Sequence, residues 1–485
     1  MQPKLELLSS ELTSRILDEA FQLLMDPGIR VLAAPARELL AGAGAQVDET
    51  TCVARIPERI VRTALDSVPK TFYLYNRHGD CSVTYGGNNV HFDPGSSSVS
   101  VLDPETLKQK PATTTDLIRL VKVAEMLPQY DAQSTAVVCA DVPKEIGDIY
   151  RLYIVLMHSI KPVVTGSFTM KNLQAMIELV SLFAGSRANL AREPQAIFDV
   201  CPNPPLTWGN FGAESLIALA QAGMPAEIVS MPLAGAAAPV TLLGAITQHA
   251  SECLSGITIH QLAKPGSPIV WGGAPAIFDM RKGTTPMGAV ETAMIDAAYA
   301  QVGKSLNLPT HCYLGASDAK VIDAQAGLES GVTAVIGALA GVNMISGAGM
   351  LDFLACQSPE KLVVDAEAVA MAKRLLAGLE VRTETLATAF FDGINFKGDF
   401  LKQRVTRELF SVEQYLPSAV IDRDSVRGWQ HDGSLDTFSR ARIRTAQLIK
   451  EYHQPQVAID RKAELDSIVE GLALEAGMST LPTLV

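Results

Sequence analysis

The sequence predicts an α/β protein built as a (β/α)8 TIM barrel with helical extensions at both ends. Apolar, β-rich runs alternate with amphipathic or apolar helical stretches through the middle of the chain, and roughly eight such pairs occur. No dinucleotide-binding glycine motif follows any of the predicted strands. These observations favour the barrel over a doubly wound open sheet, which stays the alternative.

Eight short runs are predicted as the barrel strands: residues 90–95, 135–140, 161–168, 195–202, 227–232, 268–275, 310–317 and 342–349. Two of the predicted helices have clear ends. The stretch 114–127 opens on threonines and an aspartate that can cap it, and 358–378 runs from Ser-Pro-Glu to a glycine. We expect an N-terminal helical segment over 1–85, the barrel over 86–380, and a C-terminal helical segment packed on the barrel over 381–485.

Composition excludes several classes of partner. The formal charge of −12 and the pI near 5.2 argue against a nucleic-acid or anionic-membrane surface, which would need a basic patch. Two long runs without Asp, Glu, Lys or Arg, 228–251 and 330–351, are interrupted by Pro, Gly or Asn, so they are predicted as buried strand and helix pairs rather than membrane spans. The seven cysteines form no C-x-x-C and no signal peptide opens the chain, which indicates a cytoplasmic protein with reduced thiols.

The familiar catalytic motifs are incomplete. Residues 300–305 lack the first glycine of a P-loop, 315–319 lack the last glycine of a nucleophile elbow, and no H-E-x-x-H occurs. His311 is predicted to be a core residue rather than a metal ligand. We therefore predict no metal site and no catalytic nucleophile.

The carboxyl ends of the predicted strands carry the candidate substrate-binding residues. The aromatic candidates are Phe92, Trp208, Trp271, Tyr313 and Phe353. An aromatic mouth suits a quaternary ammonium ion through cation–π attraction, with rim packing as the alternative. Polar candidates follow the seventh strand: Asp318, which can also cap a helix, Lys320, which can hold a carboxylate or stay solvated, and Gln325.

An ordered series of blocks along nearly the whole chain resembles one family. The blocks include "RILDEAFQLLMDPGIRV", "VHFDPGSSSVSVLDPET", "MPLAGAAAPVTLLG", "SDAKVIDAQAG" and "GVNMISGAGML". They are similar to the trimethylamine:corrinoid methyltransferase family, in its branch without pyrrolysine. The resemblance implies a (β/α)8 barrel that transfers a methyl group from an amine to the Co(I) of a corrinoid, a methylation of the EC 2.1.1 class in one-carbon, methanogenesis-related metabolism.

The resemblance also implies a separate cognate corrinoid protein. No histidine here sits in the D-x-H-x-x-G pattern that such carriers use to ligate cobalt, so we expect no permanently bound cofactor. The small residues Gly235, Ala236, Ala237 and Ala238 would form a loop that lets the corrinoid approach the substrate methyl group. Tight packing between a strand and a helix is the alternative reading of this stretch.

Two departures from the family bear on the substrate. Pyrrolysine is absent, and betaine-specific members carry His at the position of Ser346 and a "GHFL" at 398–401, where this chain has Asp399. The resemblance implies a quaternary amine such as glycine betaine, whose carboxylate Lys320 or Ser346 could hold. The alternatives are a quaternary-amine sensor, or a corrinoid-independent lyase or isomerase using Lys320 or Lys161. The composition permits a homo-oligomer.

Overall fold

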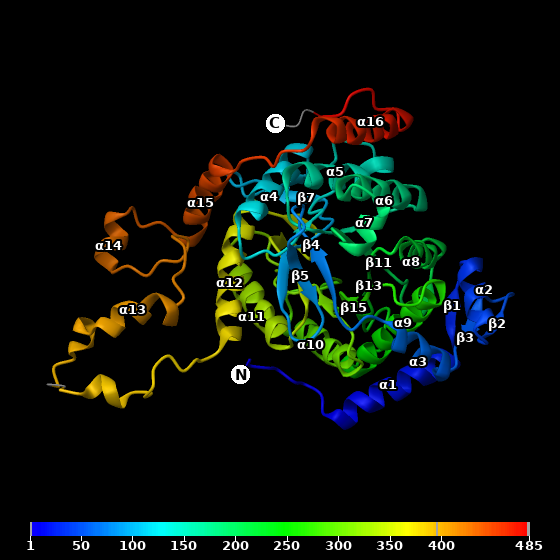
Figure 1. The fold of residues 1–485 in the computed structure, drawn as a ribbon, viewed down its shortest axis with the longest axis horizontal. Coiled ribbons are helices and arrows are strands. Elements are labelled where there is room, and N and C mark those ends of the chain that lie inside the picture. Colours follow the sequence, from blue (N-terminus) through cyan, green and yellow to red (C-terminus); the bar gives the residue numbers. More distant parts are fainter. Residues whose placement is uncertain (1, 394–395, 483–485) are drawn as a thin grey trace.

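The computed structural model describes residues 2–393 and 396–482 and has a mixed α/β fold (Figure 1). One parallel sheet has five strands in the order β15 (Ile269–Gly273), β13 (Ala226–Ser230), β11 (Ala196–Val200), β10 (Val163–Gly166) and β9 (Gln133–Ser134). A second parallel sheet has three, in the order β17 (His311–Cys312), β18 (Met344–Ala348) and β6 (His91–Pro94). Seven of the eight predicted strands are confirmed, and β9 lies just before its predicted range.

Isolated bridges and backbone hydrogen bonds outside the strand ladders join the two sheets, among them a parallel bridge between Ser98 and Val137. Trp271 of β15 forms one isolated parallel bridge with Thr310, and the backbone N–H of Asp131 donates to the Phe92 carbonyl at 2.8 Å. The prediction of an α/β fold is confirmed, whereas a closed (β/α)8 barrel is not, because these links stand where continuous ladders would close the sheet. Two of the predicted strands shorten to two residues each, β9 and β17, which leaves few backbone groups to extend the pairing.

Helices connect the successive strands. They are α4 (Thr114–Met126), α5 (Gly147–His158), α6 (Met170–Ala184), α7 (Arg187–Arg192), α8 (Asn210–Ala222), α9 (Leu242–Ala263), α10 (Val290–Ser305), α11 (Ala324–Leu339) and α12 (Pro359–Ala377). The predicted ends of α12 are confirmed: the Ser358 hydroxyl accepts from the Lys361 N–H, Pro359 occupies the first turn, and Gly378 follows the last residue. Both long apolar runs are strand and helix pairs, β13 with α9 and α11 with β18.

The first 85 residues are less helical than the sequence predicted. They contain α1 (Ser10–Met25), α2 (Ala34–Gly42) and α3 (Glu58–Ser67), but also β1 (Ile29–Val31), β2 (Gln46–Asp48) and β3 (Val53–Arg55). These strands form a small sheet with β12 (Thr207–Trp208). Strands of three residues are too short to show a period of two in the sequence, so the pattern did not reveal them.

A hairpin of β4 (Phe72–Tyr75) and β5 (Cys81–Tyr85) covers the amino ends of the parallel strands. Its side chains Phe72, Leu74, Val83 and Tyr85 pack in one buried cluster with strand residues such as Val164 and Met344. The Phe72 and Tyr85 rings stack with centroids 4.7 Å apart. Because the hairpin fills this end, access to the strands is left to their carboxyl ends.

Short strands complete the carboxyl-end loops. They are β7 (Ser100–Leu102), β8 (Gln109–Pro111), β14 (Leu233–Ala234), β16 (Ala276–Ile277), β19 (Met350–Leu351) and β20 (Cys356–Gln357). β14 precedes α9 and β16 precedes α10, and the two strands pair in parallel with each other. Pairing between these short strands therefore holds the loop backbone in place beyond the carboxyl ends of the main strands.

The C-terminal segment divides into two parts. Helices α15 (Thr437–Glu451) and α16 (Ile459–Glu475) pack on the body, α15 against α12 and α4, and α16 against α5 and α6. In contrast, α13 (Arg404–Glu413) and α14 (Val426–His431) stand away from it (Figure 1). The sequence predicted that the whole of 381–485 packs on the body, and among the described helices of this segment α15 and α16 do so. Among the described residues no helix is long and apolar enough to cross a membrane.

A helix–strand contact gives the first prediction. A methyl group on Gly256 of α9 would lie against the Trp208 indole and 2.8 Å from Ile228 Cδ1. Overpacking of this kind costs about 1–3 kcal/mol, so we expect Gly256→Ala to lower the free energy of unfolding by that amount in urea denaturation. Gly331→Ala in α11 is the matched control, because nothing lies within 4 Å of its added methyl group. The control should gain about 0.5–1 kcal/mol, and equal effects of the two changes would contradict the packing argument.

Candidate functional site

A chain of buried polar side chains joins the two parallel sheets. Glu227 of β13 lies with Oε1 3.0 Å from His311 Nδ1 on β17, and His311 Nε2 lies 3.0 Å from the hydroxyl of Ser346 on β18. The Ser346 hydroxyl donates to Asp93 of β6. All four side chains are buried, at 0 or 1% residue exposure. The four residues therefore form one continuous network, which we call the acid–histidine chain.

Strand alternation directs these groups to the face opposite the helices. Ile197 and Asp199 share that face on β11, as do Met344 and Ser346 on β18, because side chains of a strand alternate between its two faces. Gly272 of β15 leaves the space that the imidazole fills, since a Cβ there would lie 3.1 Å from His311 Nδ1. A larger residue at 272 would displace His311.

Two tyrosines and a third acid extend the chain. The Tyr85 hydroxyl donates to Glu227 Oε2 at 3.3 Å from the hairpin side, and the Tyr313 hydroxyl donates to Asp199 Oδ2 at 3.1 Å. Asp199 lies beside Glu227 and interacts with it directly. Three carboxyl groups thus converge with one imidazole, and Asp93 and Glu227 are fully buried whereas Asp199 is half-buried.

Burial sets the protonation of these groups. It raises the pKa of Asp93 and of Glu227 well above their usual range, and it raises that of Asp199. Burial also lowers the pKa of His311 to about 3, so the imidazole is neutral near pH 7. The site therefore combines a neutral imidazole with two buried acids, Asp93 and Glu227, that are shifted toward their protonated forms, while Asp199 has a pKa of about 6.

The hydrogen bonds fit one direction along the chain. Because Ser346 gives its proton to Asp93, its oxygen can accept from His311 Nε2–H, and Nδ1 is then an acceptor. Glu227 Oε1 lies 3.0 Å from Nδ1 and neither atom has another partner, so we infer that a protonated Glu227 donates to Nδ1. This tautomer is assigned from the network.

Apolar side chains lie on the carboxyl-end side of the acid–histidine chain. Tyr313 packs there with Val229, Ala274, Ala276 and Met287 in one buried cluster, against which Leu233 and Leu354 also lie. We call this cluster the apolar roof. Beside it, the buried Arg151 of α5 donates to the carbonyl of Gly166 at 2.8 Å, and its guanidinium lies 4.9 Å from the centroid of the Phe168 ring.

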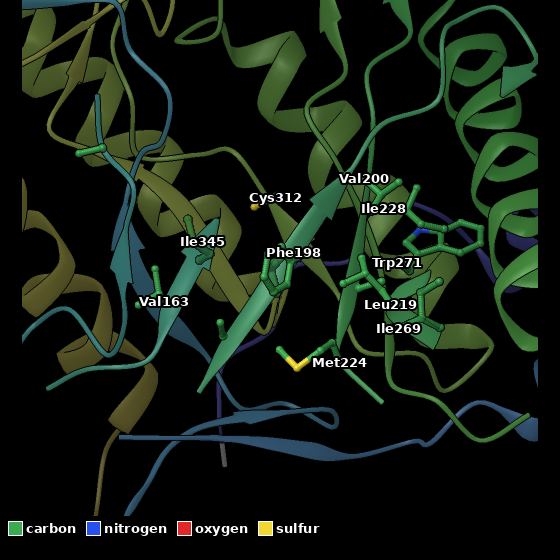
Figure 2. Packing of buried hydrophobic residues seen from close by; sticks show 14 of the residues in the cluster. Val163, Phe198, Val200, Leu219, Met224, Ile228, Ile269, Trp271, Cys312 and Ile345 are labelled. Carbon is green, nitrogen blue, oxygen red and sulfur yellow. The ribbon is translucent and has the colours of Figure 1, made fainter. Parts of the chain in front are cut away.

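Three of the predicted aromatic residues face the helices instead. Phe92 lies 5.9 Å from Lys373 Nζ of α12, the Trp208 indole donates to the Ser255 hydroxyl, and the Trp271 indole donates to the Tyr299 carbonyl. Figure 2 shows Trp271 among Val200, Ile228 and Ile269. These side chains are buried in helix–strand packing and do not meet Tyr313 or Ser346, the two predicted residues that belong to the site.

The remaining predicted residues hold loops near the apolar roof. Asp318 accepts from the N–H groups of Met287 and Gly288, and Gln325 donates to Glu329. Lys320 pairs with Asp352 at 3.0 Å and lies 3.8 Å from the Phe353 ring centroid. Asp352, Phe353 and Leu354 all have positive φ angles, 50°, 55° and 68°, a run that non-glycine residues rarely adopt. Strained backbone of this kind marks a tightly held loop.

Sequence reasoning missed Asp93, Asp199, Glu227, Arg151 and the network role of His311. The signal was a single charged residue within each apolar run, such as the Asp in "AIFDV" and the Glu in "AEIVS". Charged side chains are almost never buried in a core without a partner, so each of these residues predicts a buried hydrogen-bonding or charged partner.

The predicted approach loop is a compact, exposed turn after β13. The backbone N–H groups of Ala236, Ala237 and Ala238 all donate to the Leu233 carbonyl at 2.9–3.0 Å. Gly235 and Ala236 are exposed, as are Met231 and Val240 on either side. The turn presents almost no side-chain bulk to solvent. Within residues 2–393 and 396–482, no group of three or more His, Cys, Asp or Glu side chains is arranged to hold a metal ion.

The fold and this site define a class: an α/β protein with a buried polar centre between its parallel strands and an apolar cluster at their carboxyl ends. The comparisons identify the family. Residues 1–473 match the trimethylamine methyltransferase (MTTB) family, so the chain belongs to it and is a methyltransferase of the EC 2.1.1 type.

Individual relatives match this chain over nearly the full length of both sequences. Trimethylamine methyltransferase MttB2 of Methanosarcina mazei is 30% identical over 96% of this chain and 95% of its own. MttB of Desulfitobacterium hafniense is 29% identical, over 93% and 91%. Glycine betaine methyltransferase of Desulfitobacterium hafniense Y51 is 26% identical over 98% of each chain. The crystal structure of Methanosarcina barkeri monomethylamine methyltransferase covers 93% of this chain and 90% of its own, with a TM-score of 0.56 at 10% identity, and so shares the fold.

The burial of His311 gives the second prediction. In NMR of the histidine-labelled protein, we expect the His311 imidazole to stay neutral from pH 8 down to the acid limit of folding, because its pKa is lowered to about 3 by burial. The unfolded value is about 6.5, so this group contributes stability that is complete above that pH and is lost as the pH falls toward 3. Titration of His311 near pH 6.5 would contradict the assignment.

Proposed function

We propose that this methyltransferase moves a methyl group from a quaternary amine of the glycine betaine type to the Co(I) of a corrinoid carried by a separate protein. In this proposal the eight parallel strands act as a (β/α)8 barrel, with the reaction at their carboxyl ends. The observation that carries the proposal is the position of the Tyr313 ring, in the apolar roof directly beside the neutral acid–histidine chain.

The roof suits a quaternary ammonium group. Its methyl groups are apolar and its charge is diffuse, so an aromatic face and aliphatic side chains can hold it by cation–π attraction and apolar contact. Asp93 and Glu227 hold their protons and present dipoles rather than full negative charges. This matters because the substrate's positive charge disappears toward the transition state, and a carboxylate against it would stabilise the ground state more.

The reaction needs no proton transfer. The electron pair of Co(I) forms the bond to the methyl carbon, the C–N pair returns to nitrogen, and a neutral tertiary amine leaves. A neutral His311 is consistent with such a step. The chain's task is then to orient the methyl group and exclude water.

The corrinoid is a second substrate in this scheme. The turn at Gly235 to Ala238 is exposed and has small side chains, which supports it as the place where a bulky macrocycle reaches the strands' carboxyl ends. The apolar surface formed by Met231 and Val240 beside it fits a protein partner. The proposal places enzyme and partner in the cytoplasm.

The lysine-based lyase or isomerase is disfavoured by where the lysines lie. Lys161 precedes β10, at the amino ends of the strands, and donates to the carbonyls of Ala124 and Leu127 at 2.7 and 2.9 Å. Lys320 is paired with Asp352. Neither ammonium group reaches the acid–histidine chain. The next experiment distinguishes a quaternary-amine sensor from a methyltransferase.

The third prediction concerns the substrate. Under anaerobic conditions, reduced Co(I) cobalamin and the purified protein are offered glycine betaine, proline betaine, carnitine, choline and trimethylamine in turn. We expect conversion to methyl-Co(III), followed by its absorbance, with a carboxylate-bearing quaternary amine and none with trimethylamine. Tight binding of a quaternary amine without any methyl transfer would instead establish the sensor, and transfer from trimethylamine alone would refute the quaternary-amine assignment.

The fourth prediction concerns the approach loop. A large side chain in Ala236→Trp should raise the KM for the protein-bound corrinoid at least tenfold while leaving the Kd for the quaternary amine within twofold, because the turn lies outside the apolar roof. Ala41→Trp, at an exposed alanine of α2, is the matched control and should change neither constant. A rise in amine Kd with an unchanged corrinoid KM would place the loop at the amine site instead.

A further inference from the structure

Arg151 of α5 is a buried cation whose described hydrogen bonds all go to uncharged groups. Its exposure is 0%, and within the described part of the chain it forms no ion pair with Asp or Glu. Nη1 donates to the Ser97 hydroxyl at 2.5 Å and to the Thr135 carbonyl at 3.3 Å, and Nη2 donates to the Gly166 carbonyl at 2.8 Å. Charged side chains are almost never buried without a partner of opposite charge. The guanidinium therefore indicates an anion that this chain does not itself supply.

The two nearest acids are engaged by other groups. Burial lowers the pKa of Arg151, and the charges of Asp148 and Asp199 oppose that shift. The Asp148 carboxylate, however, accepts from the backbone N–H of Phe168 at 2.6 Å and from the Asn172 side-chain amide at 2.7 Å. Asp199 accepts from the Tyr313 hydroxyl. Both acids therefore make the environment of the guanidinium more favourable without occupying its N–H groups.

One edge of the guanidinium keeps N–H groups for a ligand. Arg151 Nε is buried and has no hydrogen-bond partner. Nη2 carries two protons, and one described acceptor, the Gly166 carbonyl, takes one of them. Nε and Nη2 share an edge of the planar group, and this edge matches the two oxygens of a carboxylate. The unpartnered atoms therefore specify a planar oxyanion rather than any negative charge.

Hydroxyl groups from three strand ends adjoin the guanidinium. Ser96 and Ser97 follow β6, Thr135 follows β9, and Thr165 belongs to β10. The Ser96 hydroxyl lies 3.4 Å from that of Thr135, which lies 3.0 Å from that of Thr165. Hydroxyl groups can donate to an anion while bringing no charge of their own. The carboxyl ends of these strands thus combine one cation with neutral donors.

This group of donors lies next to the Tyr313 side of the site. Gly166 of β10 and Asp199 of β11 are paired in the sheet. Arg151 donates to the first of these residues and Tyr313 donates to the second. Neighbouring strands are about 4.8 Å apart, so one small molecule can contact both side chains. Such a molecule would present an anion to Arg151 and an apolar or cationic group to the Tyr313 ring.

The guanidinium lies directly beneath side chains of the outer surface. The Phe168 ring centroid is 4.9 Å from it, and Phe168 is 45% exposed. Ser97, whose hydroxyl accepts from Arg151, is exposed as well. Because solvent reaches both covering residues, a rotation of the Phe168 side chain is a short route by which a ligand enters.

We propose that Arg151 is a substrate-binding residue that takes the carboxylate of a zwitterionic quaternary amine, whose ammonium methyl groups then lie against Tyr313. The inference rests on the proposed function and narrows it to amines that carry a carboxylate near the quaternary nitrogen. Of the two residues that the sequence predicted for this carboxylate, Lys320 pairs with Asp352 and the Ser346 hydroxyl donates to an acid. Arg151 has the N–H groups that those residues lack.

Isothermal titration calorimetry tests the proposal with two kinds of amine. Glycine betaine, proline betaine and carnitine carry a carboxylate, whereas choline and tetramethylammonium do not. We expect the wild-type protein to bind one of the first three most tightly. Arg151→Gln should raise the Kd of that amine at least about thirtyfold and leave the Kd of the carboxylate-free amines within about threefold. Arg151→Lys should recover part of the loss, because it restores the charge but not the planar fork.

A second buried arginine provides the matched control. Arg37 is 8% exposed and donates to the carbonyls of Val31 and Leu32. Arg37→Gln should leave every Kd unchanged, and thermal melting by circular dichroism verifies that each variant is folded. Tightest binding of a carboxylate-free amine by the wild type, an unchanged betaine Kd in Arg151→Gln, or an equal rise for both kinds of amine would each overturn the proposal.

Methyl transfer to Co(I) cobalamin, measured on the same samples, separates this proposal from the proposed function. Betaine binding that depends on Arg151 without any transfer would refute the methyl-donor assignment and leave the carboxylate site standing. Transfer from a betaine at the same KM in wild type and Arg151→Gln would refute the carboxylate site and leave the reaction standing. Transfer from choline alone would support a quaternary-amine donor and overturn the role of Arg151.

Discussion

The acid–histidine chain from Glu227 through His311 and Ser346 to Asp93 is the interaction on which the rest of the centre depends. It crosses between the five-stranded and the three-stranded sheet, which are also linked by isolated bridges and backbone hydrogen bonds outside the strand ladders. A buried polar group left without its partner costs about 1–3 kcal/mol of stability. Removing one member of the chain would therefore leave its neighbour without a partner and destabilise the fold. The network therefore holds the two sheets in register as well as forming the site.

The same constraint fixes the electrical state of the centre. Two fully buried carboxyl groups beside a neutral imidazole are costly to ionise, and burial accordingly raises the pKa of Asp93 and Glu227. A hairpin covers the amino ends of the strands, and Tyr85 from that hairpin also donates to Glu227. Toward the carboxyl ends lies the roof around Tyr313, where apolar contacts replace hydrogen bonds. A methyl donor that brings its own charge and needs no proton suits such a place.

The sequence predicted the elements better than the site. Long periodic stretches such as α12 revealed their ends through Ser358, Pro359 and Gly378, and seven strands lay where the apolar runs placed them. Which face of a strand a residue occupies could not be read from those runs, because they are apolar on both faces. Phe92 and Asp93 are adjacent, and the aromatic one was chosen as the site residue although the acid faces the centre. Trp208 and Trp271 were misplaced for the same reason. Two-residue strands, moreover, cannot show whether a sheet closes.

Helices α10, α11 and α12 support the three-stranded sheet. Helix α10 leads into β17 and its Tyr299 donates to the His311 carbonyl at 2.7 Å, α11 leads into β18, and α12 follows it. His311 and Ser346 therefore lie on strands whose outer faces these helices support. The three strands are short, and isolated bridges rather than continuous ladders connect their sheet to the larger one. The helices restrain this part of the fold from outside, while the acid–histidine chain restrains it from within.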